Sequence, residues 1–356
     1  TSPMKKIHSL LMLSALTGLI FTSCNKTTTP EIPTNIKVVA WAVGLQDTNS
    51  VGMILSTDDA GETWERQGDP AMFTGIDVIN VWATDQQNAW IICSENKIFR
   101  TMDGGATWIP VQAPAIPGNP GLSGISLIDN TTIWISGDQG TVYYSSNAGN
   151  NWTVYDSSFF HSGGMQGILA VTDRIVYVVG HFNSNAGDYG FIARTLNGGK
   201  TWDSISLPNN FNRYLWIGVD AVDSNHVVIY GQHGHYTVTH NGGNTWSTPD
   251  SVTAGDINAL VMLSKDAYWG AFDFDQIFKT FDGGKRWVSQ TSAGPLNQFL
   301  VGMDTYYSQT ALIVGESAGP LRAGKILKTT DGGNHWYLRH STDSKLWKVA
   351  FARIQE

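Results

Sequence analysis

Residues Thr101–Trp108 read TMDGGATW, and the chain carries seven segments with this pattern, Ser/Thr-x-Asp/Asn-x-Gly-x-x-Trp. The other six are Thr57–Trp64 (TDDAGETW), Ser145–Trp152 (SSNAGNNW), Thr195–Trp202 (TLNGGKTW), Thr239–Trp246 (THNGGNTW), Thr280–Trp287 (TFDGGKRW) and Thr329–Trp336 (TTDGGNHW). Their closing tryptophans are 44, 44, 50, 44, 41 and 49 residues apart. Seven copies at this spacing indicate a repeat architecture in which each copy belongs to one supersecondary unit.

The residue types in the pattern suit a tight turn. An Asp or Asn side chain accepts hydrogen bonds from backbone N–H groups of such a turn, and glycine supplies a positive φ. The Trp buries a large apolar ring between neighbouring strands. Catalysis or metal binding by these side chains is not indicated, because three of the seven positions are Asn. The predicted structural set is Asp59, Asp103, Asn147, Asn197, Asn241, Asp282 and Asp331.

Around each motif the sequence predicts the same four short strands. In the second repeat they are Ile76–Thr84, Ala89–Ser94, Lys97–Met102 and Trp108–Gln112. These are β-branched and aromatic runs bounded by turn residues. Four short strands in a repeat of this length are typical of one blade of a β-propeller.

The two ends of the chain complete one blade between them. Only two strands precede the first motif, Lys37–Val43 and Gly52–Ser56, and one strand, Lys345–Ile354, follows the last motif. If that last strand is the inner strand of the first blade, the ring closes at seven blades without an unpaired sheet edge. The prediction is an all-β, seven-bladed β-propeller of four-stranded antiparallel blades, formed by residues 36–356 as a single domain.

The N-terminal segment has the features of an export signal. Lys5 and Lys6 precede the apolar run Leu10–Phe21, which is too short for a permanent membrane span and ends at Thr22-Ser23-Cys24. Small residues directly before a cysteine resemble the lipobox of bacterial lipoproteins, which implies cleavage after residue 23 and acylation of Cys24. We therefore predict a signal peptide at 1–23, a lipidated polar tether at 24–35, and a membrane-anchored location in a bacterial cell envelope, periplasmic or surface-exposed. The alternative is an ordinary signal peptide that is cleaved near Cys24.

Charge and cysteine content limit the partners. Removal of the signal leaves 20 basic and 30 acidic side chains, a net charge of −10. Nucleic acid is not an expected partner, since it requires a concentrated basic surface. With Cys24 acylated, Cys93 is the one remaining cysteine and no internal disulfide can form.

The repeat phrase resembles a known family. Trp41-Ala42-Val43-Gly44, the stretch Ile98–Trp108 and the stretch Lys325–Trp336 resemble the photosystem II stability/assembly factor family, whose propellers carry this motif as the Asp box or BNR repeat. The resemblance covers residue 37 to the C-terminus and implies the propeller fold and a binding role of the assembly-factor type. Photosynthetic members have a basic patch for their partners, but the nine arginines here are scattered, so the assembly role itself is not carried over.

Two enzyme families share the Asp box. Sialidases open with an Arg-Ile-Pro-type motif that is missing here, and xyloglucanase-type hydrolases need two propellers, whereas this chain is long enough for one.

Binding residues are expected on the rim opposite the Asp boxes. The longest insertions fall on that rim, at 113–124, 157–164, 181–190, 208–214 and 316–324, and loops on a rigid scaffold commonly carry function. A mixture of aromatic, His, Arg and Asp side chains there suits a protein or a glycan, although ordinary loop residues are the alternative. The candidate ligand-binding residues are Phe160, His161, His181, Tyr189, Arg213, Tyr214, His233, His235, Asp273 and Asp275.

Two subsets of this rim allow sharper hypotheses. His233 and His235, with His181 from the preceding repeat, are a conceivable metal set, whereas His240 belongs to an Asp box at the other end of its strand. Asp273 and Asp275 are the best candidates for a pair of glycosidase carboxylates, and a solvated turn is the alternative. We assign no metal, cofactor or catalytic residue.

The first functional hypothesis is an envelope-anchored, non-catalytic propeller that binds a protein or glycan through these loops. The alternative is a glycan-active enzyme, either sialidase-like or another glycoside hydrolase or lyase.

Overall fold

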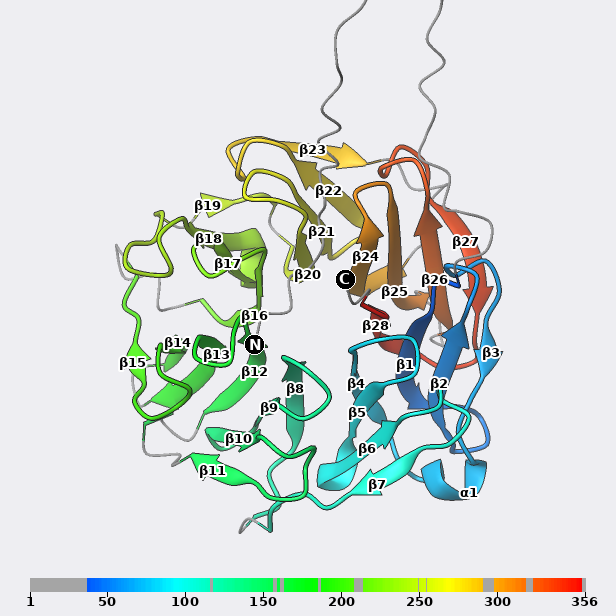
Figure 1. Ribbon diagram of the computed structural model, residues 1–356. Coiled ribbons are helices and arrows are strands. Elements are labelled where there is room, and N and C mark those ends of the chain that lie inside the picture. The colour runs from blue at the N-terminus through cyan, green and yellow to red at the C-terminus, as the bar shows by residue number, and fades with distance from the viewer. Residues whose placement is uncertain are drawn as a thin grey trace, which may run out of the picture.

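The computed structural model describes residues 37–115, 118–155, 159–160, 163–184, 187–207, 214–248, 250–253, 255–290, 298–317 and 323–353. These residues form seven four-stranded antiparallel sheets arranged in a ring around a central channel (Figure 1). The predicted all-β, seven-bladed propeller is therefore confirmed. The predicted signal peptide at 1–23, the tether with Cys24, and the candidate residues His161 and Arg213 lie outside the described residues.

Each blade contributes one strand to each of four concentric positions. In order from blade 1 to blade 7, the inner strands are β28 (Leu346–Phe351), β4 (Val78–Ala83), β8 (Leu122–Leu127), β12 (Gly164–Ala170), β16 (Trp216–Ala221), β20 (Ile257–Met262) and β24 (Gln298–Tyr307). In the same order, the second strands are β1 (Ala40–Gln46), β5 (Ala89–Cys93), β9 (Ile133–Gly137), β13 (Val176–Ser184), β17 (Val227–Gly231), β21 (Tyr268–Phe272) and β25 (Thr310–Ser317).

The third strands are β2 (Gly52–Thr57), β6 (Lys97–Thr101), β10 (Thr141–Ser145), β14 (Gly187–Thr195), β18 (His235–Thr239), β22 (Gln276–Thr280) and β26 (Gly324–Thr329). The outer strands are β3 (Glu65–Arg66), β7 (Ile109–Val111), β11 (Thr153–Tyr155), β15 (Asp203–Ser204), β19 (Asp250–Ser251), β23 (Trp287–Gln290) and β27 (Tyr337–Ser341). A single-turn helix, α1 (Pro70–Phe73), connects blade 1 to blade 2, and Asp69 caps its N-terminus. No helix within the described ranges is long and apolar enough to cross a membrane.

The C-terminal strand closes the ring as predicted. β28 pairs antiparallel with β1, with Ala40 opposite Phe351 and Val43 opposite Lys348. The strand runs from Leu346 to Phe351, shorter at both ends than the predicted 345–354. Leu346 and Phe351 are buried in the core between blades 7 and 1. The first blade is thus assembled from the two ends of the chain.

The seven motif turns, which we call box turns, share one hydrogen-bond pattern. In blade 2 the amide of Gly105 donates to Thr101 Oγ1 (2.8 Å), and the amide of Thr107 donates to Asp103 Oδ1 (2.9 Å). The Asn-containing turn of blade 3 has the same bond, from the amide of Asn151 to Asn147 Oδ1 (2.9 Å). An amide oxygen therefore replaces a carboxylate oxygen without loss of the turn.

The carboxylate of Asp59 shows why such a group is unsuited to proton transfer. Burial favours its neutral form, but hydrogen bonds from Thr63, Thr57 and Glu62 more than offset this and lower the pKa to about 2. The group therefore stays ionised near neutral pH as an acceptor for the turn.

Neighbouring blades are joined by side chains that donate to the backbone of the next box turn. Arg100 Nη1 reaches the carbonyl oxygen of Ala148 (3.3 Å), and Tyr236 Oη reaches that of Gly284 (2.5 Å). Arg194 likewise donates to the next blade. Two of the arginines near the box turns are thus used between blades rather than displayed as a basic surface.

Candidate functional site

The two faces of the propeller carry different turns. The box turns lie beside the turns between inner and second strands, as the bond from the amide of Gly104 to the carbonyl of Gln87 shows (3.0 Å). The opposite end, which we call the top face, holds the turns between second and third strands and the entrances of the inner strands. There the amide of Ser94 donates to the carbonyl of Asp77 (2.9 Å). All the described candidate rim residues belong to the top half of their blades, as the strand order predicts.

Part of the predicted rim set is brought together across blades 4 and 5. The ring of Tyr214 lies 3.9 Å from that of His235 and 6.0 Å from that of His233, centroid to centroid. His181 pairs across its sheet with Gly190, and a Cβ at Gly190 would lie 2.1 Å from the carbonyl oxygen of Tyr214. Tyr214, His233 and His235 therefore form one stretch of surface, and His181 lies on the adjacent blade, where its partner Gly190 approaches Tyr214.

This stretch does not have the geometry of a metal centre. His233 and His235 both pack against Tyr214. Within the described ranges no group of three or more His, Cys, Asp or Glu side chains is placed to hold a metal ion. Burial lowers the pKa of His235, with a smaller contribution from the backbone at Asp250 that opposes it. A neutral imidazole that packs against a tyrosine suits contact with an uncharged ligand group.

The carboxylate pair has a structural role at Asp273. One oxygen of Asp273 accepts a hydrogen bond from the amide of Asp256 (3.0 Å), and the other accepts one from Asn258 Nδ2 (2.9 Å). Asp275 has a φ of 59° and forms the tight turn that follows. Both oxygens of Asp273 already accept hydrogen bonds within the blade. The arrangement therefore favours a structural turn over a pair of catalytic glycosidase carboxylates at Asp273 and Asp275.

Phe160 requires a correction. Its side chain is fully buried, and its ring packs against Trp202 and Phe191 with centroids 5.3 and 6.1 Å away. The aromatic core of blades 3 and 4 takes up this loop residue, so Phe160 is not available to a ligand. Tyr189 lies nearer the surface and stacks on Phe182 at 5.6 Å.

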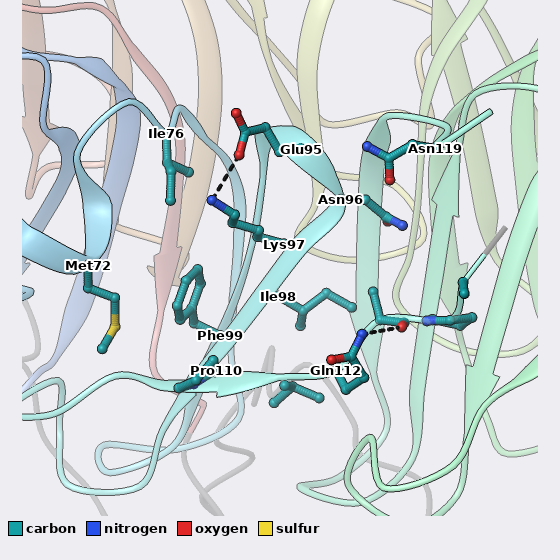
Figure 2. Close-up of a pocket in the computed structure, with 14 residues that line it drawn as sticks. Met72, Ile76, Glu95, Asn96, Lys97, Ile98, Phe99, Pro110, Gln112 and Asn119 are labelled. Atoms are coloured by element: carbon teal, nitrogen blue, oxygen red, sulfur yellow. Dashed lines mark hydrogen bonds and ion pairs between the residues drawn. The ribbon is translucent and has the colours of Figure 1, made fainter. Parts of the chain in front are cut away.

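A concavity on the top face lies elsewhere, at blade 2. A groove of about 930 Å³ runs between the connections that enter and leave this blade. Figure 2 shows Met72 and Asn119 on opposite sides of the groove, with Lys97, Ile98 and Phe99 of β6 between them. The groove is lined by Met72, Ile76, Glu95, Asn96, Lys97, Ile98, Phe99, Pro110, Val111, Gln112, Ala113, Pro114, Ala115 and Asn119.

The groove combines an apolar floor with polar ends. Ile98 and Phe99 contribute side chains of β6, and Phe99 packs on Phe73 with ring centroids 4.9 Å apart. At the rim, Lys97 Nζ forms an ion pair with Glu95 Oε2 (2.8 Å). The 113–124 insertion belongs to the rim predicted from the sequence, but none of its residues is among the ten candidates. A second signal was available in the proline-rich run that follows Gln112.

Four top-face turns share an uncommon backbone conformation. In each, two consecutive residues have positive φ, and the first of the two is not glycine. A bulky side chain in this region is disfavoured by roughly 1 kcal/mol. Phe274 is nevertheless 71% exposed at such a tip. The four leading residues are Glu95, Gln139, His233 and Phe274. The fold thus holds four chemically different side chains out from the top face.

Comparison with known proteins supports the same family as the sequence motifs. Residues 39–174 match the model described as Photosynthesis system II assembly factor YCF48. A solved structure described as YCF48 bound to D1 peptide is 15% identical, with a TM-score of 0.58 over 89% of this chain and 88% of that one. YCF48 from Cyanidioschyzon merolae is 17% identical, with a TM-score of 0.58 over 85% of this chain and 98% of that one.

An enzyme shares the fold. The GH74 xyloglucanase from Xanthomonas campestris is 12% identical, with a TM-score of 0.62 over 90% of this chain and 53% of that one. No curated protein matches the sequence.

Proposed function

We propose that this YCF48-like propeller is a non-catalytic binding protein, anchored in a bacterial cell envelope through Cys24, that holds an extended segment of a partner polypeptide on its top face. The observation that carries the proposal is the groove of about 930 Å³ at blade 2. Its volume lies in the range of sites that enclose most of a ligand, and it has the apolar floor and few polar groups that such sites use.

The lining of the groove favours a polypeptide over a glycan. Phe99 is the aromatic residue of the lining, and it is 5% exposed with its ring against Phe73. Among the described residues of the lining, no aromatic face is therefore free to stack on a sugar ring. Apolar side chains of a peptide fit beside Met72 and Val111, while Gln112 and Asn119 offer amides to its backbone. The solved YCF48 structure that holds a peptide supports this choice of ligand class.

We propose no catalytic role because the carboxylates of Asp273 and Asp59 already accept hydrogen bonds that stabilise the fold. Asp273 accepts two hydrogen bonds within its own blade. Asp59 is held ionised by its box turn, with a pKa of about 2. The likeness to the xyloglucanase is one of fold, at 12% identity. A glycan-active enzyme therefore remains the less supported alternative.

The groove is tested by adding charge to its exposed lining. Pro110→Glu and Ala115→Glu, made together, should weaken binding about tenfold or more to peptides selected from an array of extended sequences, since the added carboxylates lie at the exposed edge of the apolar floor. Fluorescence anisotropy with the selected peptides would measure this. Val288→Glu, on the exposed outer strand of blade 6, is the matched control and should leave the affinity unchanged. The proposal would be rejected if the double variant and the Val288→Glu control lost the same amount of peptide affinity. It would also be rejected if the unaltered protein bound to a glycan array but to no peptide.

Anchoring is tested separately. Cys24→Ala removes the thiol that the lipid would modify, so the protein should move from the membrane fraction to the soluble fraction when expressed in a lipoprotein-processing bacterium. Immunoblotting of the two fractions would show the shift, with Cys93→Ala as the control. A C24A protein that stays in the membrane fraction after a carbonate wash would contradict acylation at this position.

A further inference from the structure

The described chain begins on the side of the propeller that carries the box turns. Lys37 Nζ forms an ion pair with Asp58 Oδ2 of the first box turn (2.6 Å), and the carbonyl of Lys37 accepts a hydrogen bond from Gln86 Nε2 (2.7 Å). Gln86 belongs to the turn between the inner and second strands of blade 2, on the same side. Val38 then bridges to Asp59 before β1 starts. The part of the chain before residue 37 is therefore joined to the ring on this side, which we call the box face.

The length of chain between this point and Cys24 limits how far apart the two can be. Residues 24–36, thirteen in number, span at most about 45 Å when fully extended. A flexible chain of this length has a root-mean-square end-to-end distance of about 20 Å. If Cys24 carries a lipid, as the proposed function requires, the box face is on average about 20 Å from the bilayer surface.

The opposite orientation, with the top face on the membrane, requires a longer path. From Lys37 the connecting chain would have to pass two outer strands, at about 4.8 Å each, and then the height of the ring. A six-residue strand such as β28 is about 20 Å long, and the turns at both ends add to this height. The path of roughly 30–35 Å exceeds the root-mean-square reach of the chain. Stretching a chain in this way costs conformational entropy, so the tether favours the box face.

Exposed side chains on the box face suit a position near lipid headgroups. In three box turns the residue after the Ser or Thr is large and apolar, and these turns belong to the alternate blades 2, 4 and 6. Met102, Leu196 and Phe281 are 51, 42 and 64% exposed. Apolar and aromatic side chains are readily accommodated at the interface between a bilayer and water. This observation supports the same orientation as the length of the tether.

We propose that the tether holds the propeller with its box face toward the membrane and its top face toward the aqueous compartment. The inference rests on anchoring at Cys24, which is part of the proposed function, and adds the direction from which the partner approaches. A segment bound in the groove at blade 2 lies on the far side of the ring, at least about 20 Å from the bilayer. The groove therefore takes a segment from a water-exposed region of the partner polypeptide, not one that lies at the bilayer surface.

Phe281 and Phe274 provide a matched pair of labelling positions for a test. They flank the two ends of β22, with Phe281 on the box face and Phe274 on the top face, and they are 64 and 71% exposed. Phe281→Cys or Phe274→Cys would carry a fluorescent donor, and the vesicles would carry an acceptor on their lipid headgroups. Cys93 is buried and does not compete for the label. Energy transfer falls steeply with distance, and a five-residue strand is about 17 Å long. We therefore expect transfer from position 281 to exceed that from position 274 by at least about twofold.

Two ways of attaching the protein separate this inference from the proposed anchoring. In one arm, lipidated protein from a lipoprotein-processing bacterium is reconstituted into the vesicles. In the other, a hexahistidine tag replaces residues 1–24 and holds the same 25–36 tether on nickel-chelating lipids. Insertion of about twenty Gly and Ser residues after Thr34 should reduce the difference between the labels in both arms, since a longer tether permits both orientations.

The outcomes of the two arms can be told apart. Greater transfer from position 281 in the tagged protein, with no membrane association of the lipidated protein, would reject anchoring at Cys24 and support the tether geometry. Equal transfer from the two positions with the 25–36 tether, or greater transfer from position 274, would overturn the inferred orientation.

Discussion

A protein that lacks residues 346–356 should fail to form a closed ring and should aggregate or lose cooperative unfolding. These residues include β28, the inner strand of blade 1, which pairs with β1 and packs between blades 7 and 2. Leu346, Val349 and Phe351 are 0, 5 and 4% exposed. Burial of each such side chain is worth about 1.5–3 kcal/mol. Three together approach the total stability of roughly 5–15 kcal/mol expected of a domain. No segment before β1 in the described chain can replace them.

Size-exclusion chromatography and thermal unfolding followed by circular dichroism would detect this loss. Deletion of 25–34, the predicted polar tether, is the control, and we expect it to leave the thermal midpoint almost unchanged. A monomeric 1–345 protein that melts cooperatively at the normal temperature would show that the strand is dispensable for closure.

Trp134→Ala should cost about 3–5 kcal/mol of unfolding free energy, the range measured for loss of a buried aromatic ring. Trp134 is fully buried on β9 of blade 3 and stacks on Tyr155 with ring centroids 5.7 Å apart. Its edge also meets Trp202, the box tryptophan of blade 4, at 5.9 Å. Removal of the indole therefore leaves a cavity at the junction of two blades.

Denaturant unfolding of the variant at neutral pH would measure this cost. The control in the same blade is Val154→Ala, because Val154 is 46% exposed and its loss should change stability by less than about 0.5 kcal/mol. A Trp134→Ala protein whose stability falls by no more than that of the control would show that the blade junction does not depend on this ring.

On the top face, the sequence predicted which residues lie on the rim but not which of their side chains are exposed. The strand order predicts His181, Tyr214, His233 and His235 on one rim. The structure brings Tyr214, His233 and His235 together and places His181 on the adjacent blade. The same prediction includes Phe160, but its ring is buried. A loop residue that turns inward and one that turns outward have the same neighbours in sequence, so only packing separates them.

By itself, the sequence determined the number of blades, the box turns and the closing strand. The box turns and the number of blades depend on hydrogen bonds and strand pairing within one repeat, which recur at a spacing that can be counted along the chain. The closing strand is predicted because the first repeat lacks an inner strand and a closed ring leaves no unpaired sheet edge. The tertiary structure alone decided the sites. The groove joins Met72, Lys97 and Asn119 from three successive parts of the ring. This result depends on the radius of the ring and on the angle between blades, which are set by the packing of side chains between repeats rather than by the order of residues within one.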